Sequence, residues 1–209
     1  MASHPANRAE PLDRRVQAVP AALPTLARER ELVARVRAGD ERAFDTLFRS
    51  YYRPMCGFVV GFVGSVALAE ELVQDVFASV WERRATWDVR ESARSYLYAL
   101  VRNHALNHLR RRRIESRWTD SATRGDVPIG MGQGMADAEE RLSARELHEA
   151  IARALETLPP RCREVFTLRR DHHLTVPETA AALGVSVKRI EALLTRTYAV
   201  LRAALEPYR

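Results

Sequence analysis

The 209-residue chain has little of several features that mark other classes of protein. It has only two cysteines, Cys56 and Cys162, far apart and without Cys or His at ligand spacing, which excludes a disulfide scaffold and a zinc module. The most apolar stretch, residues 58–68, is too short for a membrane span and contains two glycines. The amino-terminal residues lack the apolar core of a signal peptide. We therefore expect a reduced, cytoplasmic protein without membrane insertion.

Aromatic residues and lysine are also scarce. Aromatics make up only 7% of the chain, so a core must rest mainly on Leu, Val and Ala, and with 9 glycines this composition favours helices over sheets. Of the 33 basic residues only Lys188 is a lysine, and the net charge is +6. A basic excess suggests an anionic partner, and arginine suits phosphates and base edges. A genomic bias towards arginine codons is the alternative explanation of the Arg-to-Lys ratio.

Changes in helical periodicity divide the chain into four parts. Residues 1–24 contain four prolines and no apolar period, which is typical of a flexible arm. Helical periodicity covers 25–114 and returns over 139–209, while 115–138 contains four glycines and almost no apolar period. We expect an all-α fold of two small helical domains joined by a flexible, Gly-rich linker.

The first domain contains one clearly amphipathic helix. Asp40 can cap an earlier helix, which Pro54 is expected to kink or end. Ser65 then opens a helix with an uninterrupted apolar stripe from Ala69 to Trp81. The opposite face is polar and mostly acidic, with Glu70, Glu71, Gln74 and Asp75.

The last helix of this domain combines an aromatic ring, amides and a basic run. Ser92 can cap it, and it is expected to end near Arg113, with Arg110, Arg111 and Arg112 just before. Four of its residues follow one another at spacings of seven, four and three, so they share one face of the helix: Tyr96, Asn103, Asn107 and Arg110. Such a stripe suits stacking on bases and hydrogen bonding to base edges. The alternatives are packing by the tyrosine and a basic run that only complements the helix dipole.

The second domain contains the pattern of a helix-turn-helix. A helix over 161–170 follows two prolines, and Thr175–Glu178 is a capping box that opens a short helix to Leu183. Ala180, Gly184 and Ile190 supply the small residue, the turn glycine and the apolar pin of the motif, although an ordinary helical hairpin is the alternative. The recognition helix begins at Val187. Its expected solvent-facing residues are Ser186, Lys188, Arg189, Glu191, Ala192, Thr195 and Arg196.

The chain resembles the extracytoplasmic-function (ECF) sigma factors of bacterial RNA polymerase in four segments. They are AEELVQDVFASVWERR (69–84), SARSYLYALVRNHALNHLRRRR (92–113), LETLPPRCREVF (155–166) and TVPETAAALGVSVKRIEALLTR (175–196). The motifs follow the family order, and the resemblance covers about 28–205. The sequence LPPRCREVF in the third segment and the pair Ile190-Glu191 are most similar to the subgroup linked to iron-siderophore signalling.

The resemblance implies a specificity subunit that is not an enzyme and needs no cofactor. The acidic helix would dock on the clamp helices of the largest subunit of core RNA polymerase. The segment 86–113 would recognise and melt the minus-ten promoter element, and its loop would hold a base flipped from the non-template strand. That loop contains Trp87, Asp88, Arg90 and Glu91. The helix-turn-helix would read the minus-thirty-five element as duplex DNA, the linker would run towards the active-site cleft of the polymerase, and an anti-sigma factor is implied as a further partner.

Two departures from the family pattern concern DNA contacts. Many members have Trp at the position of Tyr96 and Asp at the position of Asn107, so we expect an altered promoter preference. The family often has Gly-Thr where this chain has Lys188-Arg189, which predicts stronger contact with phosphates.

Two other functions compete with this interpretation. A stand-alone helix-turn-helix regulator would leave the acidic helix unused, and such regulators usually need a dimerisation element, for which no strong candidate is evident. An enzyme would have to use His104 and His108, which have metal-ligand spacing, but no third ligand is evident and no Glu follows His104.

Overall fold

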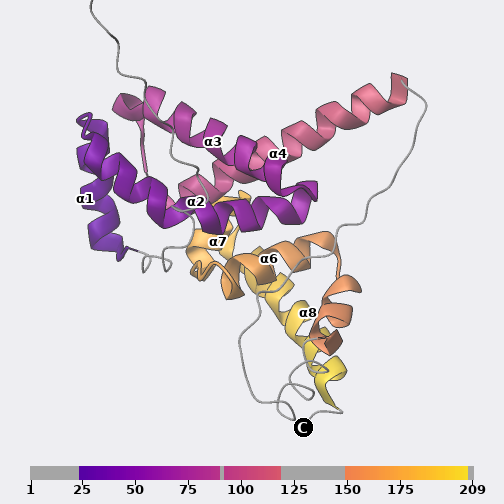
Figure 1. Ribbon diagram of the computed structural model, residues 1–209. Helices are drawn as coiled ribbons and strands as arrows, with labels where there is room; N and C mark the ends of the chain where they lie inside the picture. Colours follow the sequence, from indigo (N-terminus) through magenta and orange to yellow (C-terminus); the bar gives the residue numbers. More distant parts are fainter. Residues whose placement is uncertain (1–23, 90–91, 119–148, 207–209) are drawn as a thin grey trace, which may run out of the picture.

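The computed structural model describes residues 24–89, 92–118 and 149–206, and within them the chain forms helices and no strand. Figure 1 shows two groups of helices, one above the other. The first bundle contains α1 to α4, and the second contains α6, α7, α8 and a helix over 149–156. The all-α expectation is confirmed. No helix in the described ranges is both long and apolar enough to cross a membrane. The expected arm and nearly all of the expected linker lie outside these ranges.

The first two helices, α1 (Leu26–Arg37) and α2 (Glu41–Val63), meet at a capped turn. Asp40 caps α2, because its Oδ1 accepts from the backbone N–H of Arg42 at 2.9 Å. Pro54 was expected to kink or end this helix, and it does not end it, since α2 continues to Val63 and stops at Gly64 in the left-handed conformation. Proline removes one intrahelical hydrogen bond. Burial of the next turns, Met55, Phe58 and Val59, compensates for that loss.

Helices α3 (Val66–Glu82) and α4 (Ala93–Trp118) complete the first bundle. The predicted apolar stripe of α3 is buried from Ala69 to Val80. A short 3-10 turn, η2 (Arg84–Thr86), follows α3. Ser92 caps α4 as expected, because its Oγ accepts from the N–H of Ser95 at 3.1 Å. The helix continues past the domain boundary expected at residue 114, and Figure 1 shows its carboxyl-terminal half projecting away from the bundle.

The second bundle contains α6 (Pro160–Arg170), α7 (Val176–Leu183) and α8 (Val187–Leu205). Both halves of the predicted capping box are present at the start of α7. Gly184 ends α7 with a φ of 64°, a conformation that glycine adopts without strain. Ser186 caps α8, and Ile190 is fully buried as the pin between the helices. The predicted helix-turn-helix is therefore formed.

The two bundles pack against each other, a contact that the sequence analysis did not anticipate. One cluster of buried apolar side chains runs from Leu32 in α1 to Leu194 in α8, and α7 lies against α4. A smaller cluster around Phe166 and Leu201 holds the far end of the second bundle. This packing fixes the positions of α3, α4 and α8 relative to one another.

Candidate nucleic-acid and protein interfaces

The predicted polar face of α3 lies on the surface. Its residues Glu70, Glu71, Gln74 and Asp75 are all exposed. The buried Leu72, Val73 and Val76 face the opposite way, into the core. Because α3 contains no basic residue, this mostly acidic face carries no positive charge of its own.

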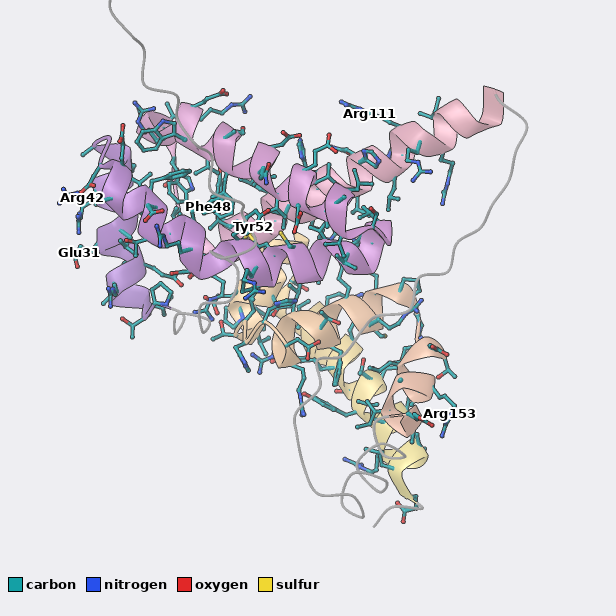
Figure 2. All side chains as sticks on the ribbon, viewed as in Figure 1. Glu31, Arg42, Phe48, Tyr52, Arg111 and Arg153 are labelled. Atoms are coloured by element: carbon teal, nitrogen blue, oxygen red, sulfur yellow. The ribbon has the colours of Figure 1, made fainter. Side chains whose placement is uncertain are left out.

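An aromatic groove borders the acidic face. A cavity of about 410 Å³ between α2 and α3 is lined by Phe44, Phe48, Phe77 and Trp81, among others. Figure 2 shows Phe48 beside Tyr52 on α2, and their rings stack with centroids 4.7 Å apart. Tyr52 also accepts a hydrogen bond from Gln74 Nε2 at 3.2 Å. The walls of this groove come from two helices, so the spacing of residues along either helix does not reveal it.

The predicted stripe on α4 forms one surface. Asn103, Asn107 and Arg110 are exposed, and Tyr96 is half-buried. Asn107 Oδ1 accepts from Arg110 Nη1 at 2.7 Å, so the amide and the guanidinium meet on the same face. Arg111 is also exposed, and Figure 2 shows it projecting from the free half of α4.

The segment before α4 places its predicted residues differently. Trp87 is only 3% exposed, and its ring lies 5.8 Å from that of Tyr96. The indole therefore packs against the tyrosine from the core side and is not itself exposed on the surface. Asp88 is exposed. Arg90 and Glu91 lie outside the described residues.

A cavity of about 220 Å³ lies between α1, the Trp87 segment and the start of α4. Val33, Ala34 and Ala93 give it apolar walls, and Glu29 lines it although this carboxylate is only 1% exposed. Among the described residues, neither Glu29 Oε2 nor Trp87 Nε1 has a hydrogen-bond partner. Buried polar atoms are normally paired, so this acceptor and this donor have hydrogen-bonding capacity that the described residues leave unused.

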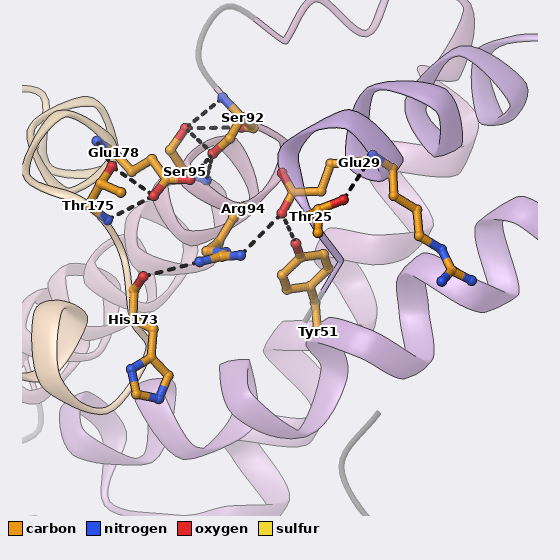
Figure 3. A network of polar contacts seen from close by, with 10 residues as sticks. Thr25, Glu29, Tyr51, Ser92, Arg94, Ser95, His173, Thr175 and Glu178 are labelled. Carbon is orange, nitrogen blue, oxygen red and sulfur yellow. Dashed lines mark hydrogen bonds and ion pairs between the residues drawn. The ribbon is translucent and has the colours of Figure 1, made fainter. Parts of the chain in front are cut away.

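The other oxygen of Glu29 belongs to a buried network, shown in Figure 3. Oε1 accepts from the hydroxyl of Tyr51 and from Arg94 Nη2, the latter at 3.5 Å. Burial raises the pKa of Tyr51, so the phenol stays protonated and donates. Burial alone would lower the pKa of Arg94, but Tyr51 and Glu29 outweigh it and the pKa is raised. Arg94 also reaches the second bundle, where its Nη1 donates to the carbonyl of His173 at 3.1 Å.

Glu178 forms a second link between the bundles (Figure 3). Its Oε2 closes the capping box on Thr175, while its Oε1 accepts from Ser92 Oγ at 2.7 Å. Burial alone would raise the pKa of Glu178. The hydrogen bonds from Thr175 and Ser92 and the charge of Arg94 outweigh burial, so the pKa lies below its ordinary value and the carboxylate is ionised.

Two further contacts complete the boundary between the bundles. Arg102 does not join the basic run of α4 but forms a nearly buried ion pair with Glu164 of α6. The ring of His172 packs edge-on against Phe58 at 5.5 Å and tilted against Tyr98 at 5.1 Å. Partners 62 to 114 residues apart leave no signal in the sequence, which is why these contacts were missed.

The predicted recognition surface on α8 is exposed throughout. All seven residues lie on the surface, namely Ser186, Lys188, Arg189, Glu191, Ala192, Thr195 and Arg196. Val187 and Tyr198 add exposed apolar area to the same helix. The hydroxyl of Thr195 donates to the carbonyl of Glu191 at 2.9 Å. The helix therefore presents hydroxyl groups, one acid and three cations on this surface.

The cysteine and histidine residues offer no catalytic arrangement within the described ranges. Burial raises the pKa of Cys56 to about 11, and Cys162 is buried. His104 and His108 have no acidic or thiol neighbour that would complete a metal site, since no group of three such residues occurs in the part of the chain that the structure describes.

Comparison with known proteins matches both bundles to one family. Residues 47–114 match the family described as Sigma-70 region 2, and residues 148–201 match Sigma-70, region 4. The RNA polymerase sigma-H factor of Pseudomonas aeruginosa is 27% identical over 88% of this chain and 96% of its own length. The ECF RNA polymerase sigma-E factor of Escherichia coli is 25% identical over 84% and 93%.

A solved structure has the same fold. It is the sigma factor RpoE of Bartonella quintana in complex with the anti-sigma factor NepR, with a TM-score of 0.61 and 21% identity over 79% of this chain and 98% of the other.

Proposed function

Because this chain is an ECF-type sigma factor of bacterial RNA polymerase, we propose which of its surfaces bind the core enzyme and which read each promoter element. A sigma factor is not an enzyme: it binds core RNA polymerase and directs transcription initiation at promoters. Region 2 here includes α2 to α4, and region 4 includes α6 to α8. The domain boundaries 25–114 and 139–209 remain a prediction.

The acidic face of α3 is the proposed contact for core polymerase. Glu70, Glu71, Gln74 and Asp75 are exposed together, opposite the buried stripe, so they can meet a partner without disturbing the core. The adjoining groove between Phe48 and Trp81 supplies buried aromatic contact area. A polar rim around aromatic anchors is typical of strong protein interfaces.

The stripe on α4 is the proposed surface for the melted minus-ten element. Tyr96 supplies a ring for stacking, and Asn103, Asn107 and Arg110 supply donors and acceptors for base edges and phosphates. Arg111 extends the basic end, and Asp88, Arg90 and Glu91 remain the predicted contacts from the loop.

The cavity beside Trp87 supports a role for this loop in holding a flipped base. Glu29 Oε2 can only accept when ionised and Trp87 Nε1 can only donate, so together they suit a base edge with an amino donor and a ring-nitrogen acceptor. Adenine and cytosine have such edges. Arg30 and Arg37 are exposed at the cavity and suit the adjacent phosphates.

The helix-turn-helix is the proposed reader of the minus-thirty-five element. The exposed first turns of α8, with Lys188 and Arg189, would enter the major groove, and Glu191, Thr195 and Arg196 lie on the same side. Arginine bidentate to guanine is the commonest specific contact in this groove.

The partners follow from this assignment. They are core RNA polymerase, promoter DNA and an anti-sigma factor, the last supported by the Bartonella complex of the same fold. We place the protein in the cytoplasm, where the polymerase and the promoters are.

One observation carries the proposal: three helices, α3, α4 and α8, each present a separate exposed polar surface. The test is run-off transcription with core polymerase on a randomised promoter pool. We expect transcripts only when the sigma factor is added, from templates that share two separated motifs. Transcripts from templates sharing a single motif would reject the division of labour between α4 and α8.

A further inference from the structure

We propose that Lys188 is a site of acylation, and that its acylation weakens the binding of region 4 to the minus-thirty-five duplex. The co-reactant is a small acyl donor, either an acyl thioester or an acyl phosphate. The effect on DNA rests on the proposed function, because Lys188 lies on the surface of α8 assigned to duplex reading. The modification itself rests only on the amine and its surroundings.

Lys188 is the single lysine among 33 basic residues, so it carries the one side-chain amine of the chain. A guanidinium keeps its charge in proteins, whereas a lysine amine is a target of acetylation. For contact with phosphates or guanine an arginine serves at least as well, and the next residue, Arg189, is one. A genomic bias towards arginine codons accounts for the other basic positions and leaves this one unexplained. The exception points to a role that requires an amine.

The amine of Lys188 is exposed and unpaired. The residue lies in the first turn of α8, and its side chain is on the surface. In the ranges that the structure describes, no ion pair or hydrogen bond engages its ammonium group, and Glu191, three residues further on, does not pair with it. The amine therefore has no partner to lose before it reacts.

The space around Lys188 is open on both sides along the helix. Helical side chains lean towards the amino end of their helix, so this one lies over the turn that contains Gly184. Gly184 is exposed, and a Cβ atom added there would meet nothing within 4 Å. One turn further along α8 the neighbour is Ala192, whose side chain is a single methyl group. A small acyl donor can therefore reach the amine.

The reaction is an acyl transfer without oxidation or reduction. The ammonium group first releases a proton to solvent, and the free amine attacks the carbonyl carbon of the donor. The new bond is an amide between Nζ of Lys188 and that carbon. The bond from the carbon to the sulfur of a thioester, or to the oxygen of an acyl phosphate, breaks. The leaving thiolate or phosphate takes up the second proton of the amine.

Acylation removes one of the three cations on the α8 surface. Lys188, Arg189 and Arg196 are opposed there by the single acid Glu191, so the loss of one positive charge halves the net charge of this surface. Each cation that contacts a phosphate releases counterions, which makes affinity depend on salt. The acylated protein should therefore bind every duplex more weakly and with a shallower salt dependence.

The reactivity is tested on the full-length chain with acetyl coenzyme A and, separately, with acetyl phosphate. Peptide mass spectrometry locates the acetyl group. Arg35→Lys supplies the matched control, because it adds an exposed amine beside a carboxylate: Arg35 pairs with Asp40 at 2.8 Å. In this variant acetylation at position 188 should be about two- to fivefold faster than at position 35, the factor that a surface ion pair supplies. Reaction with one donor alone identifies the donor class.

An equal or slower reaction at position 188, or no reaction with either donor, would overturn the inference. The protein recovered from growing and from starved cells of its own bacterium gives the second measurement. We expect an acylated fraction at Lys188 in at least one of the two states. An unmodified amine in both would also overturn the inference.

The effect on DNA is measured with holoenzyme and a duplex that holoenzyme has selected from a randomised minus-thirty-five pool. Acetylation should weaken binding about three- to tenfold at low salt and lower the slope of affinity against salt by about one. Lys188→Gln should reproduce the loss without reagent, and Lys188→Arg should bind equally before and after treatment. Unchanged binding by the acetylated wild type would overturn the control of duplex reading. A holoenzyme that selects no duplex would instead reject the proposed function, while the peptide maps still decide the modification.

Discussion

Ser92 donates a hydrogen bond from its Oγ to Oε1 of Glu178 at 2.7 Å, and this bond joins the amino ends of two different helices. Ser92 caps α4, and Glu178 closes the capping box of α7. Both helix amino ends carry partial positive charge, so one carboxylate stabilises two dipoles.

This arrangement predicts an unequal effect of two similar substitutions. Ser92→Ala removes a helix cap and the bond to Glu178, and should lower the free energy of unfolding by about 2–3 kcal/mol. Ser65→Ala removes only the cap of α3, where Ser65 accepts from the N–H of Leu68, and should cost about 1 kcal/mol. Urea denaturation measures both, and equal losses would contradict the contribution of the contact between the bundles.

The buried His172 predicts that stability falls in mild acid. Its pKa is lowered to about 4 by burial against Phe58 and Tyr98 and by the charge of His173, from an ordinary value of 6.5. The unfolded chain therefore takes up this proton first, so the contribution of the neutral ring is complete above pH 6.5 and is lost as the pH falls to about 4. Between pH 7 and pH 5 the loss should be about 2 kcal/mol.

Urea denaturation of the wild type and of His172→Leu at pH 7 and pH 5 measures this loss of stability. The variant should not show the loss, because it has no ring to protonate. Two other ionisable groups nearby also have shifted pKa values. Burial raises the pKa of Asp171, which favours the fold in acid, and the lowered pKa of Glu178 withdraws its contribution only below its ordinary value of 4.5. Arg94 stays charged throughout. A slope unchanged in His172→Leu would assign the pH dependence to other groups.

Charge reversal on α3 should weaken binding to core polymerase. Glu71→Lys with Asp75→Lys changes two exposed side chains opposite the buried stripe, so the fold should persist. Each reversal should cost on the order of 1 kcal/mol of binding free energy, with a stronger salt dependence. Competition with a labelled sigma factor for core polymerase measures the loss. Glu31→Lys with Glu156→Lys, also exposed but on α1 and in the second bundle, should bind normally. Unchanged affinity of the α3 variant would remove this face from the interface.

Substitutions on α8 should separate duplex binding from later steps. Lys188→Ala and Arg189→Ala should each weaken binding of holoenzyme to a minus-thirty-five duplex, by about 1–3 kcal/mol where a bidentate base contact is lost. Transcription from a pre-melted template should suffer less. Arg202→Ala, exposed near the other end of α8, is the control and should behave as wild type. Equal losses on both templates would mean that α8 does not read the duplex.

Removal of the aromatic ring on α4 should weaken binding of the melted strand. Tyr96→Ala should cost holoenzyme about 1–3 kcal/mol on a single-stranded minus-ten oligonucleotide, and Asn103→Ala should also lower affinity. Binding should weaken with salt because of the arginines from Arg110 onwards. Arg202→Ala, exposed on α8 and outside this surface, is again the control. If Tyr96→Ala loses thermal stability but forms open complexes normally, the ring only packs against Trp87.

The sequence predicted the parts of this molecule that depend on neighbours along the chain. Caps at Asp40, Ser65 and Ser186 and the glycine turn at Gly184 are local chemistry, and each is present in the structure. Of the two effects expected at Pro54, a kink or an end, the end does not occur, because burial of Phe58 outweighs the hydrogen bond lost at the proline. The cavity beside Glu29 and the contacts of α4 with the second bundle depend on packing between distant segments, which periodicity does not encode.

Helix α4 is one unbroken helix from the contact at Ser92 to the projecting arginines. At 1.5 Å per residue its 26 residues span about 39 Å, and a helix of that length resists both bending and twisting. Asn107 and Arg110 therefore keep a fixed distance and orientation relative to Ser92, through which α4 contacts the second bundle. The position of the second bundle and the direction in which the cations of α4 project are thus set by the same rigid element.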